Sequence, residues 1–284
     1  MSSFTAACVQ MTSKGNVQEN LYLATALIRE AASAGADFIA TPEVTNMLEP
    51  HKSEARAKAQ FQENDITLKA FRALAEETGK WILAGSLVIK NPDDDRLANR
   101  SFLIRPDGDI AAQYDKIHMF DVELDTGESH KESRAYAPGD AAQLAETTWG
   151  MFGMSVCYDV RFPHLYQKLA LAGAGVLTVP AAFTATTGEA HWHILLRARA
   201  IENGAFVIAP AQCGQHTEKR HTYGHSLIID PWGKILAEAG EEPGFVTAEI
   251  NMAEVTRRRQ QIPNLRNIRD FSMHAPDSVA DAAE

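Results

Sequence analysis

Apolar and polar positions along the chain follow two spacings, one typical of strands and one typical of helices. Apolar residues fill Phe4–Met11 and Asp37–Pro42, which we therefore predict to be buried strands. Between them, apolar side chains recur three and four positions apart over Asn16–Ala34, the pattern of a helix with one buried face. Gly35 is expected to end this helix, because glycine readily adopts the left-handed conformation found after many helices.

The same order of elements occurs twice along the chain. The first half continues with a helix over Asp65–Thr78 and a strand over Trp81–Lys90. The second half predicts strands over Met151–Cys157, Gly175–Pro180 and Ala205–Pro210, and helices over His164–Ala172 and Glu189–Asn203. A hairpin is expected after each half, since Pro106-Asp107-Gly108 and Pro231-Trp232-Gly233 are turn sequences between apolar runs.

This alternation of strands and helices indicates an α/β protein. Because the hairpins add antiparallel strands, the sheets should be mixed. We predict a four-layer α-β-β-α sandwich with two mixed sheets, formed by a single domain over residues 1–272. Residues 273–284 are polar and rich in Ala and Asp, which favours a flexible C-terminal tail or an oligomer contact.

Composition excludes several classes of function. The 284 residues are 45% hydrophobic and 23% charged, as in ordinary globular proteins, and the net charge of −10 argues against a nucleic-acid partner. An anionic small substrate stays possible, because a pocket can be locally basic. The three cysteines are too few for a disulfide framework, and neither a leader peptide nor a long apolar run is evident. A cytoplasmic protein without a membrane partner is expected.

One cysteine stands where chemistry is favoured. Cys157 ends an apolar run and Pro163 is placed to open the next helix, so the thiol should lie at a strand-to-helix turn. Free backbone N–H groups at such a turn favour a thiolate and can hold an oxyanion. The alternative, a buried structural cysteine, is the commoner role of a cysteine in an apolar strand.

Three further side chains could complete such a site. Glu43 follows an apolar strand, where partial burial would raise its pKa and suit a general base; the alternative is a surface glutamate. Lys116 follows a hairpin strand and could neutralise an oxyanion, although most lysines are simply exposed. Glu132 could orient Lys116 and the substrate nitrogen, or be an ordinary loop glutamate.

Three ordered segments resemble the motifs of the nitrilase-like carbon–nitrogen hydrolases. They are Pro42-Glu43, Asp115-Lys116-Ile117-His118 and Val156-Cys157-Tyr158-Asp159-Val160-Arg161-Phe162-Pro163. The resemblance extends from about residue 4 to residue 270. It implies a Glu-Lys-Cys triad in which Cys157 attacks an amide carbonyl and forms a thioester. Glu43 is then the base, and Lys116 holds the oxyanion.

The same resemblance assigns two supporting groups and an assembly. Glu132 stands where many members carry a second glutamate, and the backbone N–H of Tyr158 would share the oxyanion with Lys116. No cofactor is implied. The family also suggests a homodimer or higher homo-oligomer.

The second half resembles the Nit branch of this family, and within it the deaminated glutathione amidases. The segments that carry this likeness are Thr187–Trp192, Leu196–Glu202, Ala211–Gly214, Glu218–Arg220 and Tyr223–Ser226. The implied reaction is hydrolysis of deaminated glutathione to 2-oxoglutarate and cysteinylglycine. An ω-amidase acting on 2-oxoglutaramate, another aliphatic amidase, an N-carbamoyl amino acid hydrolase and a nitrilase remain alternatives.

A substrate with two carboxylates requires donors in the pocket. Arg161 is the candidate for a bidentate carboxylate clamp, unless it only braces the turn through Asp159. Lys219, Arg220 and His221 could form a second basic patch for the dipeptide end, or be a solvated loop.

Metal and serine chemistry are less favoured by the sequence. His191 and His193 are two positions apart and would not share a helix face, and the group His216, His221 and His225 matches no known ligand spacing. We therefore predict no metal site. The chain lacks the Gly-x-Ser-x-Gly motif of serine hydrolases. A non-enzymatic binding protein of the same fold is disfavoured by the intact triad.

Overall fold

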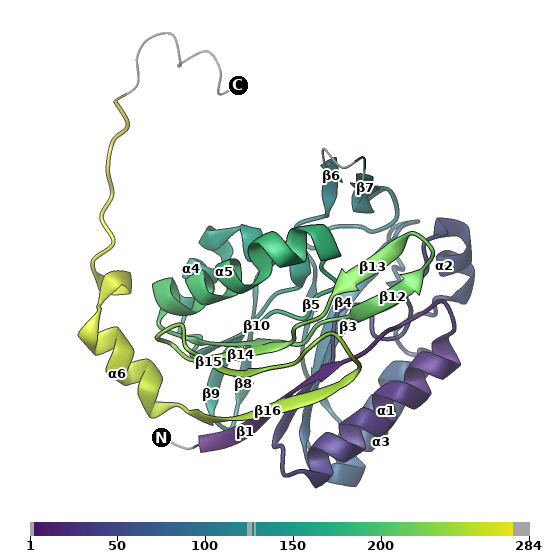
Figure 1. The fold of residues 1–284 in the computed structure, drawn as a ribbon, viewed down its shortest axis with the longest axis horizontal. Helices are drawn as coiled ribbons and strands as arrows, with labels where there is room; N and C mark the ends of the chain where they lie inside the picture. The colour runs from purple at the N-terminus through teal and green to yellow at the C-terminus, as the bar shows by residue number, and fades with distance from the viewer. Residues whose placement is uncertain (1–2, 124–126, 128, 275–284) are drawn as a thin grey trace.

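The computed structural model describes residues 3–123, 127 and 129–274. Two six-stranded sheets lie at its centre, with helices α1 (Val17–Ser33) and α3 (Ile66–Thr78) on one outer side (Figure 1). Helices α4 (Pro163–Leu171) and α5 (Ala185–Asn203) lie on the opposite side. The predicted α-β-β-α sandwich with two mixed sheets is confirmed.

The first sheet has the order β16-β1-β2-β3-β4-β5. Strands β1, β2 and β3 run parallel, while β16, β4 and β5 are antiparallel to their neighbours. Its strands are β16 (Gly244–Asn251), β1 (Ser3–Gln10), β2 (Phe38–Ala40), β3 (Trp81–Lys90), β4 (Leu97–Ile104) and β5 (Ile110–Asp115). Helices α1 and α3 make the two parallel crossovers and contact each other.

The second sheet repeats this design with the order β15-β14-β11-β10-β9-β8. Strands β9, β10 and β11 are parallel, and α4 and α5 provide their crossovers. Its strands are β15 (Ile235–Glu238), β14 (Leu227–Ile229), β11 (Phe206–Ala209), β10 (Val176–Thr178), β9 (Gly150–Met154) and β8 (Gln143–Thr147).

Aromatic side chains hold the two sheets together. The ring of Phe38 in β2 lies 5.1 Å from that of Phe152 in β9, and Phe4 in β1 stacks on Trp149 at 4.2 Å. Aromatic pairs of this kind add about 0.5–1.5 kcal/mol each beyond the area they bury. The segments that follow β2 and β10 meet at one end of the interface, where the backbone N–H of Ala182 donates to Glu43.

Local capping chemistry fixes the helix boundaries. Asn16 accepts hydrogen bonds from the first turn of α1, and Asp65 does the same for α3. Gly35 has a φ of 93°, so the predicted left-handed end of α1 is confirmed, and Gly79 ends α3 in the same way with a φ of 66°. The predicted start of α5 at Glu189 is wrong, because Thr184 accepts from the N–H of Thr187 and begins the helix earlier.

Several elements were not predicted from the hydrophobic pattern, β8 and β16 among them. The others are α2 (Lys52–Lys58), β6 (Asp121–Glu123), β7 (Ser129–Lys131), β12 (Cys213–Thr217), β13 (Arg220–Tyr223), α6 (Ala253–Gln261) and the 3₁₀ turns η1 (Glu132–Arg134), η2 (Cys157–Arg161) and η3 (Asn264–Arg266). The predicted strand Met151–Cys157 ends at Met154, since the chain turns into η2.

The sequence also predicted no membrane-spanning segment, a single domain and a flexible C-terminal tail. Within residues 3–123, 127 and 129–274, every helix is too short or too polar to cross a bilayer. A single domain over residues 1–272 stays a prediction, as does the flexible tail, most of which (275–284) lies outside the described residues.

Candidate active site

The side chains singled out from the sequence converge in one cavity. Glu43 follows β2, Lys116 follows β5, Glu132 begins η1 and Cys157 begins η2, and all four line a cavity of about 530 Å³. Glu43, Lys116 and Cys157 are only 4%, 2% and 7% exposed. Charges this deeply buried require partners, since an unpaired buried ion is strongly destabilising.

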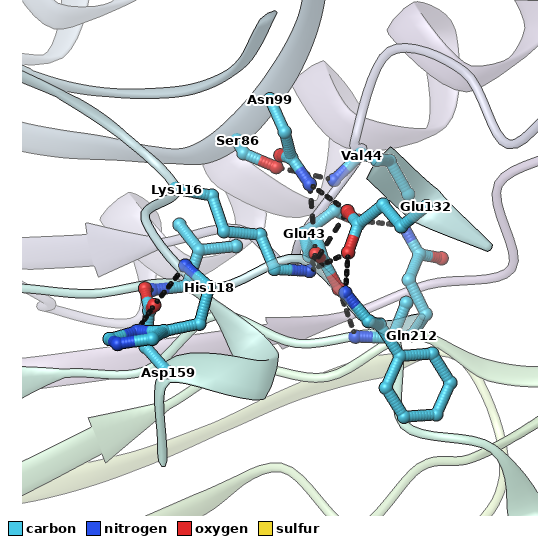
Figure 2. Close-up of polar contacts among 12 residues, drawn as sticks. Glu43, Val44, Ser86, Asn99, Lys116, His118, Glu132, Asp159 and Gln212 are labelled. Atoms are coloured by element: carbon cyan, nitrogen blue, oxygen red, sulfur yellow. Dashed lines mark hydrogen bonds and ion pairs between the residues drawn. The ribbon is translucent and has the colours of Figure 1, made fainter. Parts of the chain in front are cut away.

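Lys116 is held between two carboxylates. Its Nζ donates to Oε1 of Glu43 at 2.9 Å, and to Oε1 and Oε2 of Glu132 at 3.0 and 2.8 Å. Figure 2 shows the Lys116 side chain reaching from its strand to both glutamates. The ammonium group is therefore fixed in place beside the cavity.

Asn99 in β4 joins the two glutamates and was missed by sequence reasoning. Its Nδ2 donates to Oε1 of Glu43 at 2.9 Å and to Oε1 of Glu132 at 3.3 Å (Figure 2). The other Glu43 oxygen accepts from the backbone N–H of Ala182 at 2.9 Å. Asn99 begins the polar run Asn99-Arg100-Ser101 inside β4, and an amide within a strand was the signal that could have identified it, because buried amides need partners.

Strained backbone holds the cysteine in position. Cys157 has a φ of 50°, a left-handed conformation that costs a non-glycine residue on the order of 1–3 kcal/mol. Its N–H donates to the carbonyl of Pro180 at 2.9 Å. The buried carboxylate of Asp159 accepts from the N–H of Val156 at 2.8 Å and from the hydroxyl of Tyr114 at 2.7 Å. These bonds pin both sides of the turn.

The electrostatics of the thiol differ from the expectation. Burial raises the pKa of Cys157 well above its ordinary value of 9.0, and the nearby Glu43 carboxylate raises it further. Lys116 acts in the opposite direction without reversing the shift. The expectation that backbone N–H groups at the turn would favour a thiolate is therefore wrong for the free site, because burial and the neighbouring carboxylate outweigh the cation. Deprotonation by Glu43 during the attack stays a prediction.

The expected raised pKa of Glu43 is also wrong. Burial acts to raise it, but Lys116 and the hydrogen bonds from Cys157, Lys116 and Asn99 hold the pKa below 4.5. For Lys116, burial acts to lower the pKa, but Glu132 and Glu43 hold it well above its ordinary value. At rest Glu43 is therefore an ionised carboxylate that is hydrogen-bonded to the neutral thiol of Cys157, and Lys116 is an ammonium.

Cationic side chains surround the outer part of the cavity. Lys52, Lys131, Lys219 and Arg220 line it, together with the ring of Tyr158. Arg220 is positioned by the carbonyl of Ala182, to which its guanidinium donates at 2.8 Å. The cavity thus combines a reactive interior with a basic mouth, an arrangement suited to a small substrate that carries carboxylates.

Two other residues predicted to bind substrate lie elsewhere. Arg161 and His221 are not among the described residues that line the cavity. The Arg161 guanidinium lies 5.9 Å from the ring centre of Tyr158 and 5.4 Å from that of Phe183, and it is 3.3 Å from Nδ1 of His191. Tyr158 and Phe183 line the cavity, so Arg161 stands behind its wall.

This fold and this set of side chains define a class of protein, a cysteine-dependent hydrolase of carbon–nitrogen bonds. The model of the family described as carbon-nitrogen hydrolase matches residues 5–260. The chain therefore belongs to the carbon–nitrogen hydrolase family, and the predicted family and enzyme class are confirmed.

Relatives of known name and structure agree with this assignment. The chain is 45% identical to a deaminated glutathione amidase of Synechocystis sp. over 273 residues, 94% of this chain and 98% of that protein. The NitFhit protein of C. elegans superposes with a TM-score of 0.88 at 34% identity, covering 95% of this chain and 66% of that one.

A third comparison concerns the cysteine. The amidase of Nesterenkonia sp. AN1 superposes with a TM-score of 0.77 at 26% identity, covering 93% of this chain and 96% of that one. A glutamate-to-glutamine mutant of that amidase carries the acetamide moiety of fluoroacetamide covalently at its active-site cysteine.

Proposed function

We propose that the chain hydrolyses an amide through a thioester on Cys157, with Glu43 as general base and Lys116 as the oxyanion partner. The observation that carries the proposal is the buried ammonium of Lys116, which bridges Glu43 and Glu132 beside the thiol. No cofactor takes part in the scheme. Glu132 keeps Lys116 in position.

In the proposed first step, the thiol proton passes to Glu43 while sulfur attacks the carbonyl carbon. Because the thiol pKa is raised, deprotonation and attack must be coupled rather than sequential. The oxyanion is stabilised by Lys116 and by the backbone N–H of Tyr158. Glu43 then returns the proton to the leaving nitrogen, the carbon–nitrogen bond breaks, and a thioester remains.

The second step restores the enzyme. Water loses a proton to Glu43 and attacks the thioester carbon, and the carbon–sulfur bond breaks. The proton on Glu43 returns to sulfur, so that the carboxylic acid leaves and the thiol is regenerated.

As substrate we propose deaminated glutathione, which would give 2-oxoglutarate and cysteinylglycine. Support comes from the relatives of that name and from the basic mouth of the cavity. We propose that Lys219 and Arg220, which line the cavity, bind the dipeptide carboxylate. For Arg161 we propose a supporting role, in which it positions Tyr158 and Phe183.

Two variants test the chemistry. Cys157→Ala should leave a folded protein without turnover, and residual activity within about tenfold of wild type would exclude Cys157 as the nucleophile. Glu43→Gln should lower turnover by about 10²–10⁴-fold, the usual contribution of a general base. Alkylation of Cys157 by an uncharged haloacetamide should also slow in this variant. An unchanged alkylation rate would contradict the assignment of the base.

The substrate is tested by comparing kcat/KM for deaminated glutathione, 2-oxoglutaramate, a simple aliphatic amide, an N-carbamoyl amino acid and a nitrile. Deaminated glutathione should exceed the others by at least about tenfold, or about 1.4 kcal/mol of transition-state binding. A preference for 2-oxoglutaramate would instead assign the chain as an ω-amidase. Arg220→Met should raise KM for deaminated glutathione more than for a neutral amide.

We further propose a cytoplasmic homodimer or higher homo-oligomer. Large apolar side chains are exposed on α5, where Ile194 and Ile201 are 69% and 49% accessible. Phe271 and Met273 beyond η3 are also exposed, at 88% and 82%. Surfaces of this kind favour a protein contact. Sedimentation as a single 31.1 kDa species at micromolar concentration would contradict the proposal.

A further inference from the structure

A second cluster of ionisable side chains lies outside the cavity. It consists of His193 in α5, His225 between β13 and β14, and Glu238 at the end of β15. Oε1 of Glu238 lies 3.0 Å from Nε2 of His193 and 2.9 Å from Nδ1 of His225. One donor atom from each residue falls within 4.8 Å of the other two. None of the three lines the cavity.

The surroundings hold these rings in place. Tyr223 stacks on His225 with ring centres 4.4 Å apart and meets His193 edge-on at 6.0 Å. The indole N–H of Trp192 donates to the backbone carbonyl of His225 at 2.8 Å. Such packing reduces the conformational freedom that a ligand would otherwise have to remove from the two imidazoles.

We propose that His193, His225 and Glu238 form a binding site for a divalent transition-metal ion, with Zn²⁺ as the best fit. Two imidazole nitrogens and a carboxylate oxygen are a donor set that zinc sites use, with water as the fourth ligand. With bonds of about 2.0–2.1 Å, a tetrahedral ion separates its ligand atoms by about 3.3 Å. The two oxygen–nitrogen separations of 3.0 and 2.9 Å need only a small outward movement to reach this distance. The histidine nitrogens, which lie within 4.8 Å of each other, need to approach by no more than about 1.5 Å.

Donor chemistry and exposure both bear on the choice of ion. Mg²⁺ and Ca²⁺ are disfavoured, because both prefer oxygen ligands, whereas imidazole suits Zn²⁺, Ni²⁺ and Cu²⁺. The three side chains are 28%, 21% and 37% exposed, which leaves a route for the ion and its water. Protons compete with a metal ion for imidazole and carboxylate ligands, so the site should weaken at acidic pH.

The spacing of residues in the sequence could not predict this site. The prediction of no metal site rested on the spacing of histidines that are close in the sequence. Of these, His191 takes no part in the cluster, because its ring lies beside Arg161. The actual partners of His193 come from two other elements, 32 and 45 residues away. A bound ion would link α5 to the β14–β15 hairpin.

Zinc titration by calorimetry tests the proposal, with Cys157→Ala as the background because a reactive thiol also binds Zn²⁺. One equivalent should bind, and His193→Ala and Glu238→Gln should each weaken binding by at least about tenfold. His191→Ala, which removes a histidine from the same helix, should bind as the background does. Circular dichroism verifies that each variant is folded, and His225 is left intact because its φ is 55°.

Co²⁺ gives a second readout. Its visible absorption in the background protein should be that of a four- or five-coordinate ion, and His193→Ala and Glu238→Gln should each remove it. Absence of zinc binding in the Cys157→Ala protein would overturn the proposal. If His193→Ala and Glu238→Gln bound zinc as tightly as the Cys157→Ala protein does, the proposal would be overturned as well, since the ion would then be bound elsewhere.

Discussion

Replacing Glu132 by glutamine tests whether the second carboxylate supports catalysis. Oε1 of Glu132 accepts from Lys116 at 3.0 Å and from Asn99 at 3.3 Å, while Oε2 accepts from Lys116 at 2.8 Å and from the N–H of Phe120 at 2.6 Å. Both oxygens thus face donors only. Glutamine keeps the shape but offers one oxygen, so its NH₂ group must face the ammonium and one other donor.

The magnitude follows from what Lys116 loses. A hydrogen bond to a charged group contributes about 1.5–3 kcal/mol, and Lys116 keeps Glu43 as its remaining charged partner. With the ammonium drawn toward Glu43, the oxyanion should lose most of its stabilisation. Removal of one oxyanion donor lowers kcat by about 10²–10³-fold, equivalent to about 2.7–4 kcal/mol. The cations at the cavity mouth are unchanged, so KM should change by less than about threefold.

The assay measures kcat and KM together with alkylation of Cys157, which verifies that the thiol remains accessible. Glu77→Gln is the matched control, because it removes the same charge from an exposed pair with Arg29, whose side chains are 53% and 52% accessible. The control should behave as wild type, since exposed ion pairs contribute little. If Glu132→Gln kept kcat within about threefold of wild type, Lys116 would not depend on Glu132 and the argument would fail.

Two further predictions concern stability. Burial lowers the pKa of His216 from 6.5 to about 4, so the folded protein holds this histidine neutral. The contribution of the neutral histidine to the free energy of unfolding is complete above pH 6.5. It is lost as the pH falls towards 4, by about 3 kcal/mol in total. Urea unfolding at pH 7 and pH 5 should show a smaller loss for His216→Gln than for wild type, and equal losses would refute this. A Cβ at Gly188 would lie 2.3 Å from Cβ of Tyr223, so Gly188→Ala should lower the free energy of unfolding by about 1–3 kcal/mol. Gly240→Ala, with open space around its added methyl, is the control, and equal thermal stability of the two variants would count against the predicted clash.

Capping residues and hydrophobic patterns within single segments of the sequence predicted part of the fold. The bounds of α3 and β3 follow from capping residues and apolar runs, so Asp65–Thr78 and Trp81–Lys90 were correctly predicted. Strand β16 was missed, although it pairs with β1 along its whole length. From Val246 to Asn251 its apolar residues alternate with exposed polar ones, the pattern of a half-buried strand, so a local signal was present and was overlooked.

The candidate site followed a different rule. Lys116 lies 73 residues from its partner Glu43 and 41 from Cys157, and no periodicity predicts that the ends of β2, β5 and β9 meet. Only the resemblance of three motifs to a known family grouped these residues. The prediction that the pKa of Glu43 would be raised was wrong for the same reason. It depends on how close Lys116 and Asn99 lie, and only the packing of the two sheets sets those distances.

The charge balance of the site gives a physical reason for a second glutamate. In the proposed mechanism Glu43 takes a proton as sulfur attacks, so it becomes neutral at the moment when the oxyanion forms. Without a second carboxylate, the buried Lys116 would then have only the transient oxyanion as its counter-charge. Glu132 takes no part in this proton transfer and holds the ammonium at 2.8 Å. One carboxylate can therefore exchange protons while the other keeps the cation paired, a division that a single glutamate could not provide.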